Sequence, residues 1–583
     1  MEFCEKCGSK VAKDDKFCQS CGAALQQVMQ ENISEAGEKG QPTREIQKKK
    51  KRWPILVASL VFVFVLGGIG MAFFGSSVSG VKMDYLKAES NTMKQAYKEW
   101  SDVYGDAFAL ADKMSKESYE QTLDLSASVS GADIPNITLI QAILESMKLQ
   151  MNTKQDVKNE QYEVSLNFMM NNDSLAELSM YQSNDKTAVK LPLLNEPMYY
   201  FIENEKFGEF AKKMDPSYEG PDNIKELFNF KDQLNTGLEA EYKEWIKGYG
   251  TFLFAELDEE NFSKEKNVQY QGKNVDKITL TLTDEEIKSL LTNLLDKIQD
   301  DKQLIDLLVK QGQVALLEQT EEEYRQELKD GLKEGIAEIK SELKDASFGN
   351  GLVSIIYVNS NNLIIARDFS MEVAEQSGDE AVKISYVVDS NEADGLQIER
   401  KLTIKAPEGS DEGELAFKWN TEKKKNNAEG TDVNTVMKLT FTEYGSESVN
   451  LGLNMDTVQK ANEAVTDFVI ETEGDLFEDE EVSISGQLTQ KIDQDLSKNY
   501  ANSEVKLSLT IGMDDYYSGY QEFTVHLNAD TKTDFTNDLG FPDLQSDGAR
   551  NVSEMSEDEW YMIFEEISNN FEQLMYNTVG LDF

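Results

Sequence analysis

Residues 278–298 read ITLTLTDEEIKSLLTNLLDKI and contain the change of period that defines the fold class. Ile278, Leu280 and Leu282 alternate with threonines, as in a strand with one packed face and one wet face. From Ile287 onward the apolar residues recur every three or four positions, as on one face of a helix. Both periods in a single stretch predict an α+β protein.

A capping signal marks the boundary between this strand and this helix. Thr283 and Glu286 fit the S/T-x-x-E capping box, in which the hydroxyl and the carboxylate accept hydrogen bonds from free amides at the start of a helix. The same signal recurs at Thr320 and at Ser556. We therefore expect helices to begin after residues 283, 320 and 556.

Strand patterns lie on both sides of this helical stretch. A helical pattern at Met83–Met114 precedes alternating apolar runs in residues 123–193, and further alternating runs follow Gly351. We expect a large domain of antiparallel meander sheets with packed helices, divided into two lobes. The expected parts are a first α+β lobe at residues 75–282, a helical segment at residues 283–349, and a second, β-rich lobe with a C-terminal helix at residues 350–583.

Charge limits the classes of partner. The 583 residues include 58 Lys and Arg, 107 Asp and Glu, and one His, for a net charge of −49, with +3 in residues 1–54 and −52 in residues 75–583. A body this acidic argues against nucleic acid as a partner, because binding phosphates requires Lys and Arg. The single histidine, His526, is expected on the wet face of a strand, which leaves little of the usual acid–base and metal chemistry.

Two C-x2-C pairs stand within residues 1–25, and they contain every cysteine of the chain. Two such knuckles bring four thiolates to one point, which is the closed tetrahedral shell that Zn(2+) prefers in structural sites. So small a module has little core, so metal binding would supply its folding free energy. The alternative is a redox or disulfide pair. The expected zinc ligands are Cys4, Cys7, Cys18 and Cys21.

A polar linker at residues 26–54 ends in a basic cluster, and an uncharged apolar run, residues 55–74, follows it. Twenty residues, at about 1.5 Å each, span a hydrocarbon core of about 30 Å, so the run predicts a transmembrane helix. The positive-inside rule then places the N-terminus in the cytoplasm and the C-terminal domain outside the cell. A cleaved signal peptide is the alternative, although its apolar region is usually shorter. The cations that set this topology are Lys48, Lys49, Lys50, Lys51 and Arg52.

The N-terminal part resembles a known group of proteins. FCEKCGSKVAKDDKFCQSCGAAL at residues 3–25, the polar linker, KKKKRWP and the apolar run are similar to the zinc-ribbon, single-pass membrane proteins of Gram-positive bacteria. That group includes the teicoplanin-resistance-associated envelope proteins. The resemblance implies a cytosolic zinc ribbon, one span and an exported domain, with the four cysteines as zinc ligands. It stops at the end of the apolar run.

Catalytic motifs are missing from the sequence, which has no GxSxG elbow, Walker loop or HExxH pair. We therefore expect no catalytic residues and no enzymatic activity. The expected function is that of a cell-membrane protein linking the zinc ribbon to an acidic extracytoplasmic domain that binds a ligand or acts as a scaffold in envelope sensing or organisation. Its expected partners are the membrane and an envelope protein, lipid or glycan. The alternative is an envelope hydrolase with paired carboxylates.

Overall fold

The computed structural model divides the chain into two compact units, Met1–Lys51 and Arg52–Phe583. Residues 2–3, 10–11 and 80–579 are described, except for residues 132–136, 197, 228–229, 231–237, 313–320, 377–379, 393–394, 407–412, 427–429, 443–448, 474–481, 516–518 and 546–547. In the first unit, β1 (Glu2–Phe3) pairs antiparallel with β2 (Lys10–Val11). All other elements belong to the second unit.

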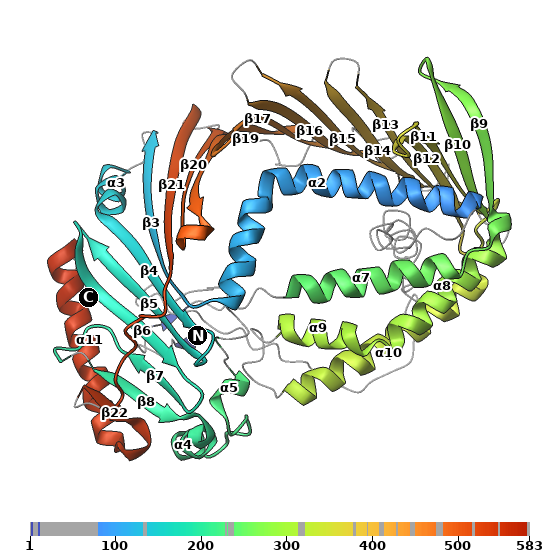
Figure 1. Cartoon of the computed structure of the whole chain (residues 1–583). Helices are drawn as coiled ribbons and strands as arrows, with labels where there is room; N and C mark the ends of the chain where they lie inside the picture. Colours follow the sequence, from blue (N-terminus) through green and yellow to red (C-terminus); the bar gives the residue numbers. More distant parts are fainter. Residues whose placement is uncertain are drawn as a thin grey trace. The chain divides into compact units, whose positions relative to one another are not determined.

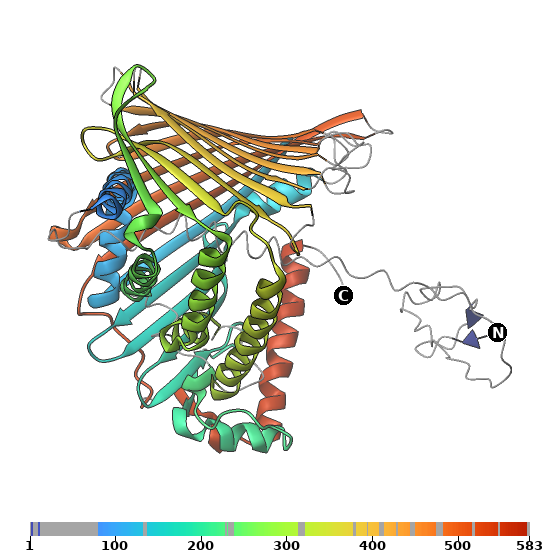
Figure 2. The ribbon, with the colours of Figure 1, turned by 90° about the vertical axis from the view of Figure 1, so that its right-hand side faces the viewer.

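Twenty strands of the described residues, β3 to β22, form one sheet in the second unit. Their bounds are β3 (Tyr119–Gly131), β4 (Met147–Asp156), β5 (Gln161–Met170), β6 (Asp173–Gln182), β7 (Lys186–Lys190), β8 (Tyr199–Glu203), β9 (Phe262–Tyr270), β10 (Lys273–Leu282), β11 (Leu352–Val358), β12 (Ile364–Val373), β13 (Val382–Asn391), β14 (Leu396–Lys405), β15 (Glu414–Lys425), β16 (Thr431–Thr442), β17 (Val449–Lys460), β18 (Glu463–Glu473), β19 (Val482–Asp495), β20 (Tyr500–Asp515), β21 (Gly519–Phe535) and β22 (Ala549–Asn551). Figure 2 shows the sheet running without a break from the green β9–β10 hairpin to the cyan strands.

The prediction of two lobes is wrong, because two strand pairings join their sequences into one sheet. β10, from the expected first lobe, pairs antiparallel with β11, from the expected second lobe. β21 pairs antiparallel with β3 along its register from Gly131 opposite Phe523 to Tyr119 opposite Phe535. The alternating pattern of a strand determines which of its faces is buried but not which strand lies beside it. The fold-class prediction failed for this reason.

Helices lie on the concave side of the sheet, as Figure 1 shows for α2 and α7–α10. The helices of the described residues are α2 (Val81–Lys116), α3 (Ile137–Ser146), α4 (Phe207–Met214), α5 (Ile224–Leu227), α7 (Leu238–Ala255), α8 (Asp284–Gln299), α9 (Lys302–Gly312), α10 (Glu321–Asp345) and α11 (Glu557–Val579). The predicted helical segment therefore forms an excursion between two neighbouring strands, β10 and β11.

Two of the three predicted capping signals are confirmed. The Thr283 hydroxyl accepts a hydrogen bond from the Glu286 amide at 3.3 Å, and the Glu286 carboxylate accepts one from the Thr283 amide at 2.7 Å. Ser556 and Glu559 make the same reciprocal pair at the start of α11. The third signal, at Thr320, lies outside the described residues.

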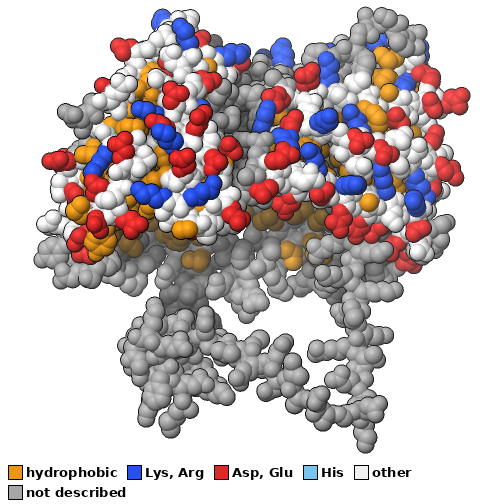
Figure 3. Space-filling view, turned by 90° about the horizontal axis from the view of Figure 1, so that it is seen from below, with side chains coloured by type: hydrophobic (Ala, Val, Ile, Leu, Met, Phe, Trp, Pro, Cys, Tyr) orange, Lys and Arg blue, Asp and Glu red, His pale blue; other side chains and the backbone are white. Residues whose placement is uncertain are grey.

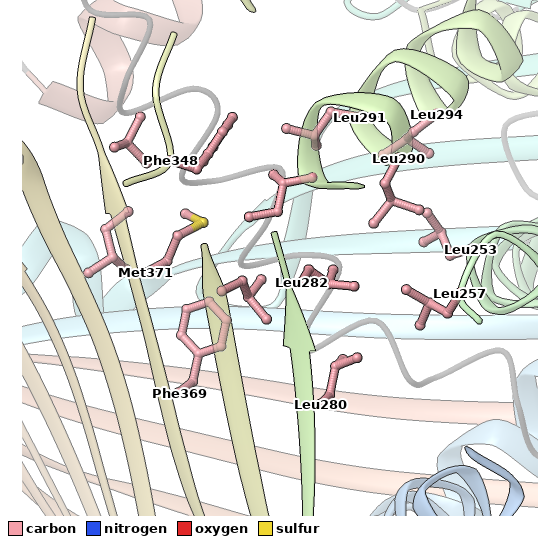
Figure 4. Close-up of a cluster of buried hydrophobic side chains, with 14 of the residues drawn as sticks. Leu253, Leu257, Leu280, Leu282, Leu290, Leu291, Leu294, Phe348, Phe369 and Met371 are labelled. Atoms are coloured by element: carbon pink, nitrogen blue, oxygen red, sulfur yellow. The ribbon is translucent and has the colours of Figure 1, made fainter. Parts of the chain in front are cut away.

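The largest core packs α8 against the concave face of β10–β12 (Figure 4). Leu282, Phe348 and Met371 are at most 2% exposed there. Gly351, just before β11, has φ +84°, and a Cβ at this position would lie 2.0 Å from the Leu282 carbonyl oxygen. Glycine is required here, because the chain returns from the helical excursion in contact with the strand that it left.

The expected single-pass architecture is corrected. No helix in the part of the chain that the structure describes is both long and apolar enough to cross a membrane. The apolar run itself, residues 55–74, lies outside the described residues. Its prediction depended on the composition and length of the run and on the cations before it. The expected localisation, a cell-membrane protein with a cytoplasmic N-terminus and an extracellular C-terminal domain, is therefore not retained.

The expected function is corrected with it. The sequence predicts a link between a zinc ribbon and a two-lobed extracytoplasmic domain, because it predicts a ribbon, a span and two lobes in that order. The described residues form one continuous sheet with an internal helical excursion. The two-lobed arrangement is thus absent from this part of the chain. The expected linking function and the alternative, an envelope hydrolase, both depended on that arrangement.

Truncating Leu282 tests the core at the start of the helical excursion. We expect Leu282→Ala to lower the free energy of unfolding by about 2–4 kcal/mol, because it leaves a cavity at a side chain that is 2% exposed. The matched control is Thr281→Val on the exposed face of the same strand, with an expected change within about 0.5 kcal/mol. Urea unfolding of the full chain measures both, and equal midpoints for the two variants would contradict the assignment of this core.

Candidate functional site

A cavity of about 280 Å³ lies between α2 and the strands β12–β14. Its wall is mainly apolar, and the polar groups in it come from both the helix and the strands. The apolar lining consists of Met93, Ala96, Leu363, Ile364, Ile365, Val388, Leu396 and Ile398. The polar lining includes Glu89, Arg367, Tyr386, Glu392 and Arg400.

Strand register places two arginines on the same face of the sheet. Arg367 on β12 lies opposite Val388 on β13, and Val388 lies opposite Arg400 on β14. Directly opposed residues of antiparallel strands share a face, so both arginines belong to the concave face that carries the apolar core. Since β13 alone separates their strands, their Cα atoms are on the order of 10 Å apart.

Arg367 is buried and held by α2. Its side chain is 8% exposed, and its Nη2 donates to both carboxylate oxygens of Glu89 at 2.5 and 2.6 Å. Burial acts to lower the pKa of Arg367, but the Glu89 carboxylate more than offsets it, and the pKa is raised above its ordinary value. The second terminal nitrogen, Nη1, is buried without a hydrogen-bond partner. Glu89 therefore satisfies only part of this guanidinium.

Arg400 has no carboxylate partner among the described residues. Its guanidinium carbon lies 4.6 Å from the ring centroid of Trp419, which stands opposite it on β15. Its Nη1 is also buried without a hydrogen-bond partner. Burial lowers the pKa of Arg400, opposed by the neighbouring Tyr386. Burial also raises the pKa of Tyr386, which is a further polar residue of the wall.

Polar contacts fix α2 over the sheet at this point. The Tyr85 hydroxyl and the Ser354 hydroxyl lie 3.0 Å apart, and burial raises the pKa of Tyr85 to about 12. The Thr92 hydroxyl accepts a hydrogen bond from the Ile364 amide at 2.8 Å. Tyr85, Glu89 and Thr92 are spaced three or four residues apart, as one helix face requires. One face of α2 is therefore anchored to β11 and β12 and forms a wall of the cavity.

A second hollow is more polar and more open. It lies among α7, α8 and α9, and its lining includes Asp296, Lys297, Asp300 and Asp301. Asp301 accepts hydrogen bonds from Trp245 and Tyr249 at 2.9 and 2.7 Å. Its carboxylate already has partners within the helical layer, so we place the candidate site at the arginine pair instead.

The acidic excess of the chain does not gather at one place on the face seen in Figure 3, where Asp and Glu side chains are interspersed with Lys and Arg. Among the described residues, no group of three or more His, Cys, Asp or Glu side chains could hold a metal ion. His526 is half-buried and lies opposite Ser508, with its Nδ1 2.9 Å from the Ser508 hydroxyl. Leu527, on the other face of β21, is 45% exposed, so the expected wet and packed faces are not found here.

The site residues named from the sequence and those found in the structure are different. The predicted zinc ligands Cys4, Cys7, Cys18 and Cys21, and the cations at residues 48–52, lie outside the described residues. The sequence interpretation missed the two arginines. The signal was present, because Arg367 stands between Ile365 and Phe369, and Arg400 between Ile398 and Leu402, at positions where the strand alternation calls for an apolar residue.

Comparison with known proteins identifies the N-terminal segment. A zinc-ribbon domain matches at residues 3–25. Residues 3–25 are thus similar in sequence to zinc-ribbon domains. The match confirms that part of the sequence prediction and ends before the apolar run, so it does not extend to the Gram-positive single-pass architecture. None of the curated proteins matches the chain.

Solved structures give only distant likenesses. Pseudomonas aeruginosa OpdL and OpdQ share 5% and 6% identity with this chain, cover 72% of it with 98% and 97% of their own lengths, and have TM-scores of 0.18 and 0.17. The CymD monoaromatic hydrocarbon channel shares 8% identity over 75% of this chain and 94% of its own, with a TM-score of 0.13. Scores this low carry no argument about fold or function.

Removing the carboxylate of Glu89 tests the buried ion pair. We expect Glu89→Gln to lower the free energy of unfolding by about 3–5 kcal/mol, because Arg367 is left buried without a counter-charge. The double variant Glu89→Gln/Arg367→Met removes both charges and is expected to recover most of the loss. Urea unfolding of the full-length variants measures this. A loss below about 1 kcal/mol in the single variant would show that the pair is not buried in solution.

Proposed function

We propose that this protein is a binding protein, not an enzyme, and that it binds a lipid-like small molecule on the concave face of the sheet. The observation that carries the proposal is an apolar surface that continues from the cavity and stays partly exposed to solvent. Trp419, Leu439 and Leu451 are 37%, 37% and 43% exposed. The register of β15, β16 and β17 places them on the same face as the cavity wall.

Exposed apolar side chains beside a cavity are a common feature of ligand-binding sites. Cavities that bind small molecules are usually apolar with a few placed polar groups, which matches the lining between α2 and β14. The acidic charge of the body argues against nucleic acid in this place.

Filling the cavity from the helix side tests this proposal. Ala96 is an exposed α2 residue that lines the cavity, so Ala96→Trp should block it without disturbing the core. We expect the affinity of the full chain for the neutral apolar dye N-phenyl-1-naphthylamine to fall about tenfold or more. Fluorescence titration of the dye measures the change.

The matched control for this experiment is Ala107→Trp. Ala107 is also exposed on α2 but does not line the cavity, so its replacement should leave dye binding within about twofold of wild type. Equal affinity of Ala96→Trp and Ala107→Trp for the dye would exclude the cavity as the binding site.

For the N-terminal unit, we propose that the zinc-ribbon domain binds Zn(2+) through Cys4, Cys7, Cys18 and Cys21. The support is the domain match at residues 3–25 together with four thiols in two C-x2-C pairs. Four thiolates complete a tetrahedral shell and leave no open position, so the metal would have a structural role.

Metal analysis tests this proposal directly. We expect the full chain to contain about one zinc ion, and Cys18→Ser to lose it, because three thiolates hold the metal far more weakly than four. Elemental analysis measures zinc, and a thiol titration before and after chelation measures protected cysteines. A zinc-free wild-type chain with oxidised thiols would favour the redox or disulfide alternative.

A further inference from the structure

We infer that the ligand of the concave face carries an oxyanion head group, and that Arg400 binds it with Arg367 as a second donor. This inference rests on the proposed function and specifies the class of ligand. The two guanidiniums belong to neighbouring positions on one face, and each has a buried nitrogen that no described group satisfies. An oxyanion beside Val388, between the two strands, would lie next to both guanidiniums, which line the cavity.

The missing partner of Arg400 is informative because carboxylates are abundant in this chain, with 107 Asp and Glu against 58 Lys and Arg. A buried donor without an acceptor is costly, and most native structures provide one. Arg367 has received a carboxylate from α2, whereas the ring of Trp419 is the only partner of Arg400 among the described residues. We therefore infer that the acceptor for Arg400 is a ligand and not a group of this chain.

Trp419 orients Arg400 for this role. A guanidinium held over an aromatic ring by a cation–π contact has less freedom to reorient, which favours binding of an oxyanion by its N–H groups. Charge-assisted hydrogen bonds of this kind are the stronger ones and favour oxyanions over neutral oxygen groups. The pair Arg400 and Trp419 therefore resembles a preformed head-group site.

Apolar side chains near Arg400 provide a surface for an apolar tail of the ligand. Trp419 lies beside it on β15, and Leu439 and Leu451 follow on the next two strands of the same face. A ligand with its head group at Arg400 can lay its tail across these exposed side chains. A free inorganic anion would leave them in water, so an anionic amphiphile fits the surface better.

Two carboxylates also line the cavity. Glu89 is neutralised by Arg367, with both its oxygens engaged. Glu392 is exposed, so water and salt screen its charge. The head-group position next to Arg400 thus remains the cationic part of the wall.

The test compares two ligands with the same tail. Oleate and oleyl alcohol, each below its aggregation concentration, displace N-phenyl-1-naphthylamine from the full chain. We expect oleate to bind about tenfold or more tightly than oleyl alcohol, with a preference that falls as salt is added. Oleoyl lysophosphatidate is the second anionic ligand, and its rank against oleate distinguishes a phosphate head group from a carboxylate.

The decisive variant is Arg400→Met, which keeps the apolar stem and removes the charge. We expect it to lose the preference for oleate and to bind oleyl alcohol within about twofold of wild type, which also shows that it is folded. Glu392→Gln, which removes a carboxylate of the same wall, is the charge control, with equal or tighter oleate binding expected.

The outcomes separate the two proposals. If wild type binds oleate and oleyl alcohol equally, and Arg400→Met changes neither, the head-group inference is wrong while lipid binding stands. If neither ligand nor the dye binds wild type, the proposed function itself is wrong.

Discussion

The apolar face of a single long sheet has to be removed from water, and the described chain does so unevenly. Over β10–β12 the helices complete a core in which Ile278, Phe348 and Ile356 are at most 1% exposed. Over β15–β17 the same face keeps large side chains in contact with solvent. The cavity under α2 lies at the border between these two regions.

The arginines occupy this border. In a fully covered core, two guanidiniums would have to be paired or replaced, because unpaired buried charges are expensive. Glu89 supplies the counter-charge of Arg367, and this ion pair also fixes the position of α2 over β12. Trp419 covers one face of Arg400 without neutralising it. Arg367 thus mainly stabilises the fold, and Arg400 is the arginine that we propose binds the ligand.

The sequence predicted the elements that have a strong local pattern, but it missed α4 and α7 and did not predict which strands are neighbours. The helix predicted at Met83–Met114 is α2, and the Thr283 capping box lies where the pattern placed it, because both depend on interactions within a few residues. The β3–β21 and β10–β11 pairings join distant segments, and alternation carries no information about such partners. The candidate site could not be predicted for the same reason. Glu89 and Arg367 are far apart in the sequence and form their ion pair only because α2 packs across the sheet.

The pairing of β21 with β3 also determines the order in which the molecule can be completed. A chain made from its N-terminus presents β3 early, and its edge opposite β4 stays open until β21 has been synthesised. An unpaired, half-apolar edge is a surface on which other chains can add. Pairings this distant in sequence also fold slowly. The nascent protein is therefore vulnerable to aggregation for most of its synthesis. This vulnerability ends when β21, the last long strand, pairs with β3.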